Sequence, residues 1–328
     1  MEPMRCSHLV LIGLVLLAVG SASAQADDEV GEWLDRMARA VDGLNYRGTL
    51  VHMRDGRVDT LRVIHRVDAE GVRERIYSID GQPREVLRDG KHVRTLLEGD
   101  QPLVVQGGIG ARLLPSRPVS QSSSPVIGYR MRMAGTERVA GMRARVVEIR
   151  PRDQFRYGHR FWLEENTGML LRSALLDRNG RHLQKMTFVD IDLGVPISDR
   201  ELAPGLAVRG AAESRMDEQD VPEPSAAAEL RRATWKPARL PDGFRLASVG
   251  QGVNPDGRAF EHLLFSDGLA SFSVYVEEAK RARSSDRIEA IGPVHVYTGM
   301  VEKYLVTVVG EVPSATVALV AKELERRQ

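Results

Sequence analysis

Apolar and polar residues follow two different periods in the first half of this chain. From Val30 to Val41 the apolar residues recur at intervals of three and four, and Gly43 follows them, which predicts an amphipathic helix. From Tyr46 onward they alternate with polar residues, and pairs such as Asp55-Gly56 separate the alternating runs. These runs predict strands at residues 49–53, 60–64, 73–77, 85–88, 92–97, 129–139, 143–150, 159–163, 169–176 and 184–193.

The connections between these strands are too short for parallel crossovers, so we expect an antiparallel meander. A sheet of about ten strands usually curls, which predicts a mainly β domain built as an unclosed antiparallel barrel or half-barrel. Gly107-Gly-Ile-Gly110 and the Pro115–Pro125 segment interrupt the meander, and their composition predicts a mobile loop that gates the barrel. Inward Val, Leu, Ile and Met side chains would either line an apolar cavity or fill it.

A change of composition predicts a second domain. The stretch 217–224 is acidic, carries two prolines and has almost no large apolar residue, as is typical of an interdomain linker. Alternating runs at residues 244–250, 259–265, 270–276, 294–297 and 304–309, and a helical spacing after Pro313, predict a smaller α+β domain. The predicted divisions are 1–24 as a signal peptide, 25–209 as the barrel domain, 210–232 as the linker and 233–328 as the α+β domain.

The N-terminus predicts export. Arg5 precedes an apolar run at residues 9–20, and Ala22-Ser23-Ala24 supplies small residues, so we expect a signal peptide cleaved after Ala24. The apolar run is shorter than the roughly 20 residues of a membrane-spanning helix. Cys6 is the only cysteine and lies before the apolar run, so it is no lipid attachment site and the mature chain has no thiol. We therefore expect a soluble protein in the periplasm.

The residue types that carry catalysis or bind metals form no recognisable motif. The seven histidines after the signal peptide have no partner at a spacing typical of metal ligands, and the nucleophile motifs of hydrolases are missing. Glu164 and Glu165 are adjacent in a predicted strand, where neighbours point to opposite faces, so they do not form an acid–base pair. We predict a protein that is not an enzyme and that needs no cofactor or metal.

One local charge cluster stands out in a chain whose net charge is only +1. Between residues 130 and 160, nine arginines stand against three acidic residues. Arginine forks suit carboxylates and phosphates, and export excludes nucleic acid, which leaves an acidic protein segment or an anionic lipid headgroup as the ligand. A solvated outer face of the sheet explains the same cluster equally well. The candidate binding residues are Arg130, Arg132, Arg143, Arg145, Arg156 and Arg160.

Three stretches resemble the MucB/RseB family: Tyr46-Arg-Gly-Thr-Leu50, the run from His262 to Val276, and the run from Val306 to Pro313. The resemblance covers essentially the whole mature chain. It implies an N-terminal domain similar to the lipoprotein carriers LolA and LolB. It also implies that the protein binds the periplasmic domain of a membrane-spanning anti-sigma factor of the MucA or RseA type. That factor restrains an envelope-stress sigma factor.

The same resemblance implies that binding shields the anti-sigma factor from proteolysis, and that lipopolysaccharide acyl chains or mislocalised lipoprotein reverse this protection. A periplasmic carrier of lipid or lipoprotein remains the alternative function. It would need only the barrel, whereas a regulator would use the second domain as well. For partner contact in that domain we select Phe265, Phe272, Tyr275 and Tyr304, which fit a hydrophobic core equally well. Whether the protein forms a homodimer stays open.

Overall fold

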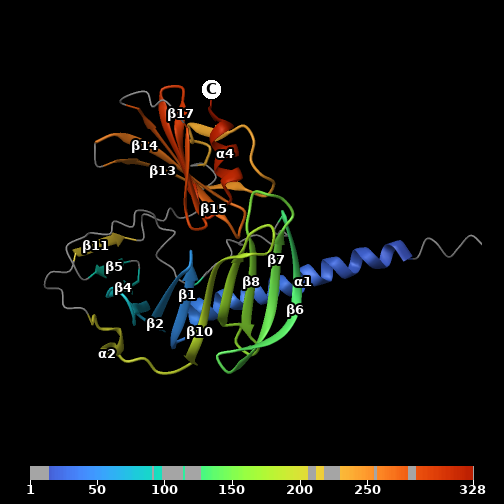
Figure 1. The fold of residues 1–328 in the computed structure, drawn as a ribbon, viewed down its shortest axis with the longest axis vertical. Helices are drawn as coiled ribbons and strands as arrows, with labels where there is room; N and C mark the ends of the chain where they lie inside the picture. Colours follow the sequence, from blue (N-terminus) through green and yellow to red (C-terminus); the bar gives the residue numbers. More distant parts are fainter. Residues whose placement is uncertain are drawn as a thin grey trace, which may run out of the picture.

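The protein folds into a large β sheet followed by a smaller one (Figure 1). The computed structural model describes residues 15–90, 92–97, 114, 127–205, 212–217, 230–254, 257–279 and 286–327. The predicted gating loop at residues 115–125, its glycine-rich start at 107–110, and most of the predicted linker lie outside these residues.

The first sheet has eleven strands, and every neighbouring pair is antiparallel. Its order is β11-β5-β4-β3-β2-β1-β10-β9-β8-β7-β6, so two local meanders are joined by the pairing of β1 with β10. The end strands β11 and β6 do not pair, which confirms the predicted unclosed antiparallel sheet. The strands are β1 (Tyr46–Arg54), β2 (Arg57–Asp68), β3 (Gly71–Ser78), β4 (Arg84–Asp89), β5 (His92–Leu97), β6 (Tyr129–Val139), β7 (Met142–Pro151), β8 (Gly158–Glu164), β9 (Leu170–Leu176), β10 (His182–Leu193) and β11 (Ala212–Asp217).

Helix α1 (Val15–Gly43) lies against this sheet and contacts β6 and β9 (Figure 1). Its apolar positions Val30, Leu34 and Met37 are buried in the same cluster as side chains of the sheet. The helix predicted at residues 30–41 is therefore present, and it extends further toward the N-terminus. It runs without a break across the predicted cleavage site after Ala24, and that cleavage stays a prediction. No helix among the described residues is long and apolar enough to span a membrane.

The second sheet has six antiparallel strands in the order β13-β14-β15-β18-β17-β16. Helix α4 (Ser314–Lys322) packs on one of its faces, so this smaller domain has the predicted α+β character. Two further short strands pair beside the sheet, β12 (Trp235–Pro237) with β19 (Leu324–Arg326). The strands of the six-stranded sheet are β13 (Arg245–Val253), β14 (Ala259–Ser266), β15 (Ser271–Glu278), β16 (Arg287–Ile291), β17 (Val294–Val301) and β18 (Tyr304–Gly310).

Five elements have no counterpart in the prediction: α2 (Asp199–Leu202), β11, β12, β16 and β19. All are three to six residues long, and β16 is exposed along its whole length, so none carries an alternating apolar signal. Strand β11 lies inside the predicted linker 210–232 and pairs with β5 of the first sheet. The division of the chain at residues 25–209, 210–232 and 233–328 stays a prediction.

Candidate functional site

The structure divides the arginine cluster between the two faces of the first sheet. Arg145 contacts Glu29 of α1 at 3.0 Å, so it lies on the face that carries the helix. Side chains alternate along a strand, and Glu148 and Arg150 therefore lie on the opposite, outer face. The register of β6 against β7 pairs Arg132 with Glu148 and so places Arg132 on the outer face too.

On the helix side, the arginines hold α1 and the turn next to it. Arg145 also places its guanidinium 5.8 Å from the ring centre of Trp33, a residue of α1. Arg143 pairs with Glu165 at 3.3 Å. These two candidates thus have acidic partners within the chain, which fits a packing role.

On the outer face, Glu148 is the shared partner of two arginines. Arg150 pairs with it at 2.6 Å, and Arg132 contacts its other carboxylate oxygen. The arginine side chains remain 61% and 67% exposed, whereas that of Glu148 is 5% exposed beneath them. Burial opposes ionisation of Glu148, but the hydrogen bond from Arg150 and the charge of Arg132 outweigh it and lower the pKa of this carboxyl.

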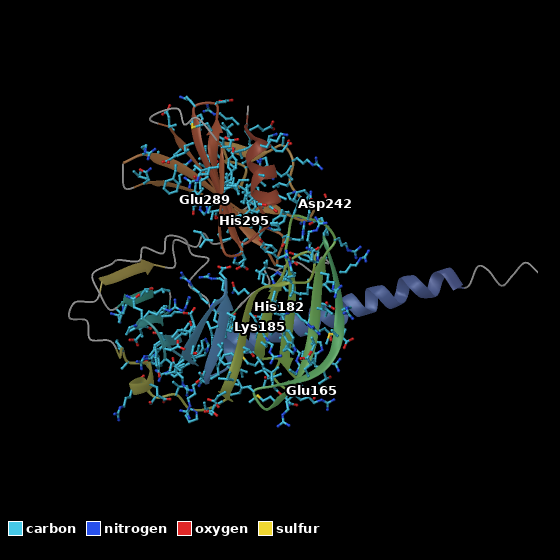
Figure 2. The ribbon with its side chains drawn as sticks, in the orientation of Figure 1. Glu165, His182, Lys185, Asp242, Glu289 and His295 are labelled. Atoms are coloured by element: carbon cyan, nitrogen blue, oxygen red, sulfur yellow. The ribbon has the colours of Figure 1, made fainter. Side chains whose placement is uncertain are left out.

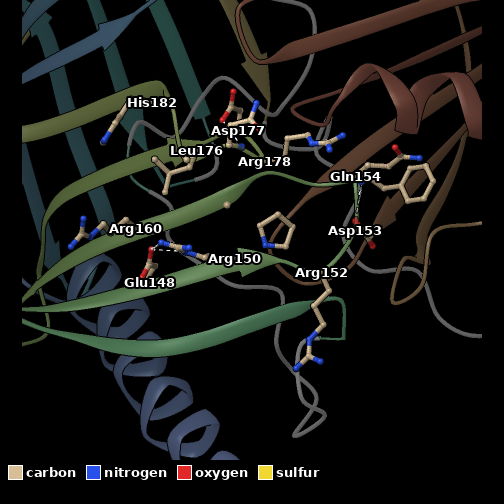
Figure 3. A pocket seen from close by; sticks show the side chains of 15 residues that line it. Glu148, Arg150, Arg152, Asp153, Gln154, Arg160, Leu176, Asp177, Arg178 and His182 are labelled. Atoms are coloured by element: carbon tan, nitrogen blue, oxygen red, sulfur yellow. Dashed lines mark hydrogen bonds and ion pairs between the residues drawn. The ribbon is translucent and has the colours of Figure 1, made fainter.

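A groove of about 750 Å³ opens on this outer face, between the β7–β8 loop and the β9–β10 turn. Figure 3 shows Glu148, Arg150 and Arg160 together on adjacent strands at one side of it. Arg160 forms a long ion pair of 3.6 Å with Glu137 and lies over the ring of Trp162 at 5.1 Å, and Arg178 projects from the turn as an exposed side chain. An exposed guanidinium such as that of Arg178 suits a phosphate or carboxylate ligand. The charged and polar lining residues are Glu148, Arg150, Arg152, Asp153, Gln154, Arg160, Asp177, Arg178, Asn179 and His182.

Arg130 and Arg156 have opposite surroundings. Arg130 is exposed next to the groove-forming strand, opposite Arg150 in the register. Arg156, in contrast, has a side chain with no exposed area and lies where the two sheets meet. It cannot meet a ligand from solution, so its selection as a partner- or anion-binding residue was wrong in this structure. Its guanidinium is used within the chain.

The contacts of Arg156 come from both domains. It pairs with Asp153 of its own loop at 3.1 Å and with Asp267 of the β14–β15 turn at 2.8 Å. It also donates to the carbonyl oxygens of Ile127 at 3.0 Å and Asp242 at 2.5 Å. Figure 2 shows Asp242 on the side of the second domain that faces the first.

Asp267 is equally buried and fully hydrogen-bonded. Its Oδ2 accepts from Arg156 and from the hydroxyl of Tyr129, and its Oδ1 accepts from the backbone N–H groups of Leu269 and Ala270. Burial is the largest influence on this carboxyl and raises its pKa in spite of these donors. Burial likewise raises the pKa of Tyr129 well above its ordinary value.

The aromatic candidates of the second domain separate into core and surface. Phe265 and Phe272 are 2% and 0% exposed, stack at 5.2 Å and belong to the core beneath α4, so their selection as contact residues was wrong. Tyr304 packs edge-on against Trp235 at 5.0 Å. Tyr275 is three residues after Phe272 in the same strand, so it lies on the other face of the sheet. There it pairs with His262, and the two rings stack at 4.4 Å. Burial lowers the pKa of His262 to about 4.

This other face of the second sheet lies opposite α4 and combines large apolar side chains with serine, threonine and Glu277 side chains. Strand alternation and register place on it residues that are half-buried and that lie outside the core cluster. A face of this kind is a candidate docking surface for another protein. Its large side chains are those of Phe260, His262, Leu264, Tyr275, Val296, Met300, Leu305 and Val309.

Within the described residues, no group of three His, Cys, Asp or Glu side chains is close enough to hold a metal ion. The described residues also form a groove lined by arginines and carboxylates, a sheet face with large aromatic and aliphatic side chains, and a buried contact between two β domains. These features define a two-domain protein that binds other molecules through its surfaces.

Comparison with known proteins identifies the family. The model of the MucB/RseB N-terminal domain matches residues 29–206, and that of the MucB/RseB C-terminal domain matches residues 229–325. The chain therefore belongs to the MucB/RseB family. It is 32% identical to the sigma factor AlgU regulatory protein MucB of Pseudomonas aeruginosa, over 96% of this chain and 95% of that protein. It is 28% identical to the sigma-E factor regulatory protein RseB of Escherichia coli K12, over 93% of each.

Solved structures resemble the chain over both domains. A crystal structure of MucB in complex with MucA(peri) has a TM-score of 0.69 at 30% identity and covers 91% of this chain and 99% of that one. A crystal structure of MucB has a TM-score of 0.60 at 29% identity and covers 92% of this chain and 98% of that one. The family to which this chain belongs is one of regulatory proteins that bind a partner.

Proposed function

We propose that this protein is a periplasmic regulator which binds the periplasmic segment of a membrane-spanning anti-sigma factor. The observation that carries the proposal is the likeness to MucB in its complex with MucA(peri), which extends over nearly all of both chains. Binding shields the anti-sigma factor from proteolysis, and a lipid ligand reverses the shielding. Export by a signal peptide cleaved after Ala24 places the protein in the compartment where that partner lies.

The face of the second sheet opposite α4 is the surface we assign to the partner. Tyr275 supplies a large, rigid aromatic side chain there, with the apolar Leu264 and Val309 on the same face. Aromatic side chains on an otherwise apolar surface commonly dominate the binding energy of an interface. Tyr304 lies at the edge of the same domain, beside Trp235.

The groove on the outer face of the first sheet is the surface we assign to anionic groups. Arg150, Arg160 and Arg178 line it, and exposed Arg130 and Arg132 extend the same charged face. A lipid phosphate or an acidic segment of the partner would meet guanidinium groups there. The ligand would then act by favouring an arrangement of the two domains to which the partner binds poorly.

A binding assay tests the proposal. The mature chain is mixed with purified MucA(peri), and complex formation is measured with and without lipopolysaccharide fragments. We expect a complex that lipopolysaccharide weakens. The absence of a complex would contradict the regulatory function, and a complex indifferent to lipid would contradict the sensing part alone. Tyr275→Ala should weaken the complex, whereas the buried Phe272 is unsuitable for this purpose.

A truncation separates regulator from carrier. Removal of the residues after Ser225 deletes the second domain, which a carrier of lipid or lipoprotein does not need. We expect the truncated protein to lose binding to MucA(peri). If it instead keeps full lipid binding and the complete chain never binds MucA(peri), the carrier function is correct. Circular dichroism of the truncated chain serves as the folding control.

A further inference from the structure

The contact between the two sheets is organised around one buried ion pair. Arg156 lies in the loop between β7 and β8, and Asp267 lies 111 residues later in the turn between β14 and β15. Neither side chain has exposed area. The guanidinium also lies about midway between two rings, 5.1 Å from Tyr129 of the first sheet and 5.0 Å from Phe244 of the second domain.

Both charged groups are held in fixed directions. Arg156 donates to four different residues, and a planar guanidinium can satisfy them only in one orientation. Asp267 is fixed by two backbone N–H groups of its own turn, at 2.9 and 2.7 Å. A small rotation of one domain against the other would therefore break several charge-assisted hydrogen bonds together.

Other polar contacts surround the pair and come from the same loop. Thr316 of α4 donates to the carbonyl oxygen of Phe155 at 2.6 Å. The hydroxyl of Tyr157 lies 3.4 Å from Nδ1 of His295. The loop at residues 152–157 thus supplies several of the polar contacts between the first domain and the second.

The physics of buried ion pairs gives this contact a particular role. Burying two charges costs much of the free energy that their attraction returns, so such a pair adds little net stability. An unpaired charge in the same place is strongly unfavourable. Orientations of the two domains that separate the charged groups without letting water reach them are therefore excluded. Contacts of this type select one geometry over its neighbours.

We propose that Arg156 and Asp267 are positioning residues that fix the relative orientation of the two domains, and that partner binding requires this orientation. Only the second half rests on the proposed function. The ion pair acts through the placement of the docking face of the second sheet relative to the first domain, and it touches neither partner nor lipid. Its loss lets the domains adopt several orientations while each sheet stays folded.

The test measures the interdomain distance directly. Because Cys6 belongs to the predicted signal peptide, the mature chain has no cysteine, and Val189→Cys with Lys322→Cys provides two exposed labelling sites in different domains. Distances between spin labels are compared for the parent, Asp267→Asn and Arg156→Met/Asp267→Asn. Asparagine keeps the oxygen that accepts from the turn, and it replaces the charged oxygen that accepts from Arg156 and Tyr129 by an N–H donor. Glu70→Gln, which removes the charge of an exposed ion pair with Arg73 away from both proposed binding surfaces, is the matched control.

We expect one narrow distance distribution for the parent and for Glu70→Gln, and a broadened or shifted distribution for both variants at Asp267. The double variant should regain thermal stability relative to Asp267→Asn because it removes the buried charge of Arg156, while Asp153, which also loses that partner, is 26% exposed; its distribution should nevertheless stay broad. If the ion pair contributed only to stability, the double variant would regain both the thermal stability and the narrow distance distribution. Distributions unchanged in both Asp267 variants would overturn the proposal.

Binding to MucA(peri) completes the test. If only about a tenth of the variant molecules hold the competent orientation, affinity falls about tenfold, and the exposed control should keep parental affinity. A parent that does not bind MucA(peri) would count against the proposed function, while the distance measurements would still decide the positioning role. Affinity unchanged in a variant with a broadened distribution would overturn the link between orientation and binding.

Discussion

Two arginine–carboxylate clusters in this protein take their arginines from the same stretch of sequence and have different roles. At the outer face of the first sheet, Arg132 and Arg150 cover Glu148 and keep most of their own surface in water. At the contact between the domains, Arg156 and Asp267 have no exposed area. The first cluster leaves guanidinium groups available to a ligand, and the second holds two parts of the chain together.

The two carboxyl groups show the difference in their ionisation. The pKa of Glu148 is lowered, because its two arginines outweigh the effect of burial. The pKa of Asp267 is raised, because there burial outweighs Arg156 and the other donors. Pairing with arginine therefore does not fix the sign of a pKa shift, since solvation of the pair as a whole decides it.

The largest effect should follow from removing the buried arginine. Arg156→Ala leaves Asp267 without its cation in a site closed to water, which we expect to cost about 3–5 kcal/mol of unfolding free energy. Chemical denaturation measures it. Arg150→Ala, which removes an exposed partner of Glu148, should cost about 1 kcal/mol or less. Equal losses in the two variants would contradict the distinction between the clusters.

A smaller effect should follow from crowding the same arginine. Gly128 has φ +96°, and a Cβ there would lie 2.3 Å from Nη1 of Arg156. Gly128→Ala should cost about 1–3 kcal/mol through backbone strain and displacement of the guanidinium. Gly180→Ala is the control, because Gly180 has φ +79° and no atom within 4 Å of an added Cβ. A Gly180→Ala loss as large as that of Gly128→Ala would mean that strain alone is responsible.

The pH dependence of stability should differ in sign between the two carboxyl groups. The folded-state pKa of Glu148 is lower than its unfolded value, so this group stabilises the protein above the unfolded pKa and the contribution is lost as pH falls through the folded value. Asp267 has a raised folded-state pKa, so its contribution declines as pH rises from the unfolded pKa through the folded value.

Denaturation between pH 3 and 7 measures this difference. Relative to the parent, Glu148→Gln should lose less stability on acidification. Asp267→Asn should lack the decline that ionisation of Asp267 causes as pH rises. If the stability of all three proteins depended on pH in the same way, the two carboxyl groups would not differ in ionisation as the comparison of the clusters requires.

The smallest effect on stability, and a clear one on binding, should come from the exposed arginines. Arg132→Ala and Arg160→Ala should change unfolding free energy by about 1 kcal/mol or less, because exposed ion pairs contribute little. If the groove takes phosphate groups, Arg160→Ala should weaken binding to vesicles that contain anionic phospholipid, and added salt should reduce the difference. Arg143→Ala, on the helix side of the sheet, should leave that binding unchanged.

Burial also explains which strands and core residues could be predicted from the sequence. Strands such as β1 and β14 are predictable because burial of one face imposes an alternation of buried and less buried positions along them. The short edge strand β16 is exposed throughout and so leaves no such pattern. Phe265 lies two residues from buried Leu263, and Phe272 lies two residues from buried Val274. This spacing favours the core positions that the two phenylalanines occupy.

Arg156 could not be separated from its neighbours by charge alone. Its partner Asp267 lies 111 residues away, and no local spacing connects the two. A usable signal was its position between Phe155 and Tyr157 in a short loop, outside the alternating strands in which the other candidate arginines lie. The sequence singled out the arginine cluster and the aromatic runs as candidates, whereas which of these side chains are buried depended on tertiary contacts.

The pairing of β1 with β10 has a consequence for the order of folding. It joins Tyr46 to Leu193, whereas the other neighbours in that sheet, apart from β11 with β5, are consecutive in the chain. A chain that enters its compartment N-terminus first can form each meander locally, but this seam must wait for residue 193. Closing so long a loop is slow compared with forming hairpins, so we expect the seam to limit the folding rate of the first domain.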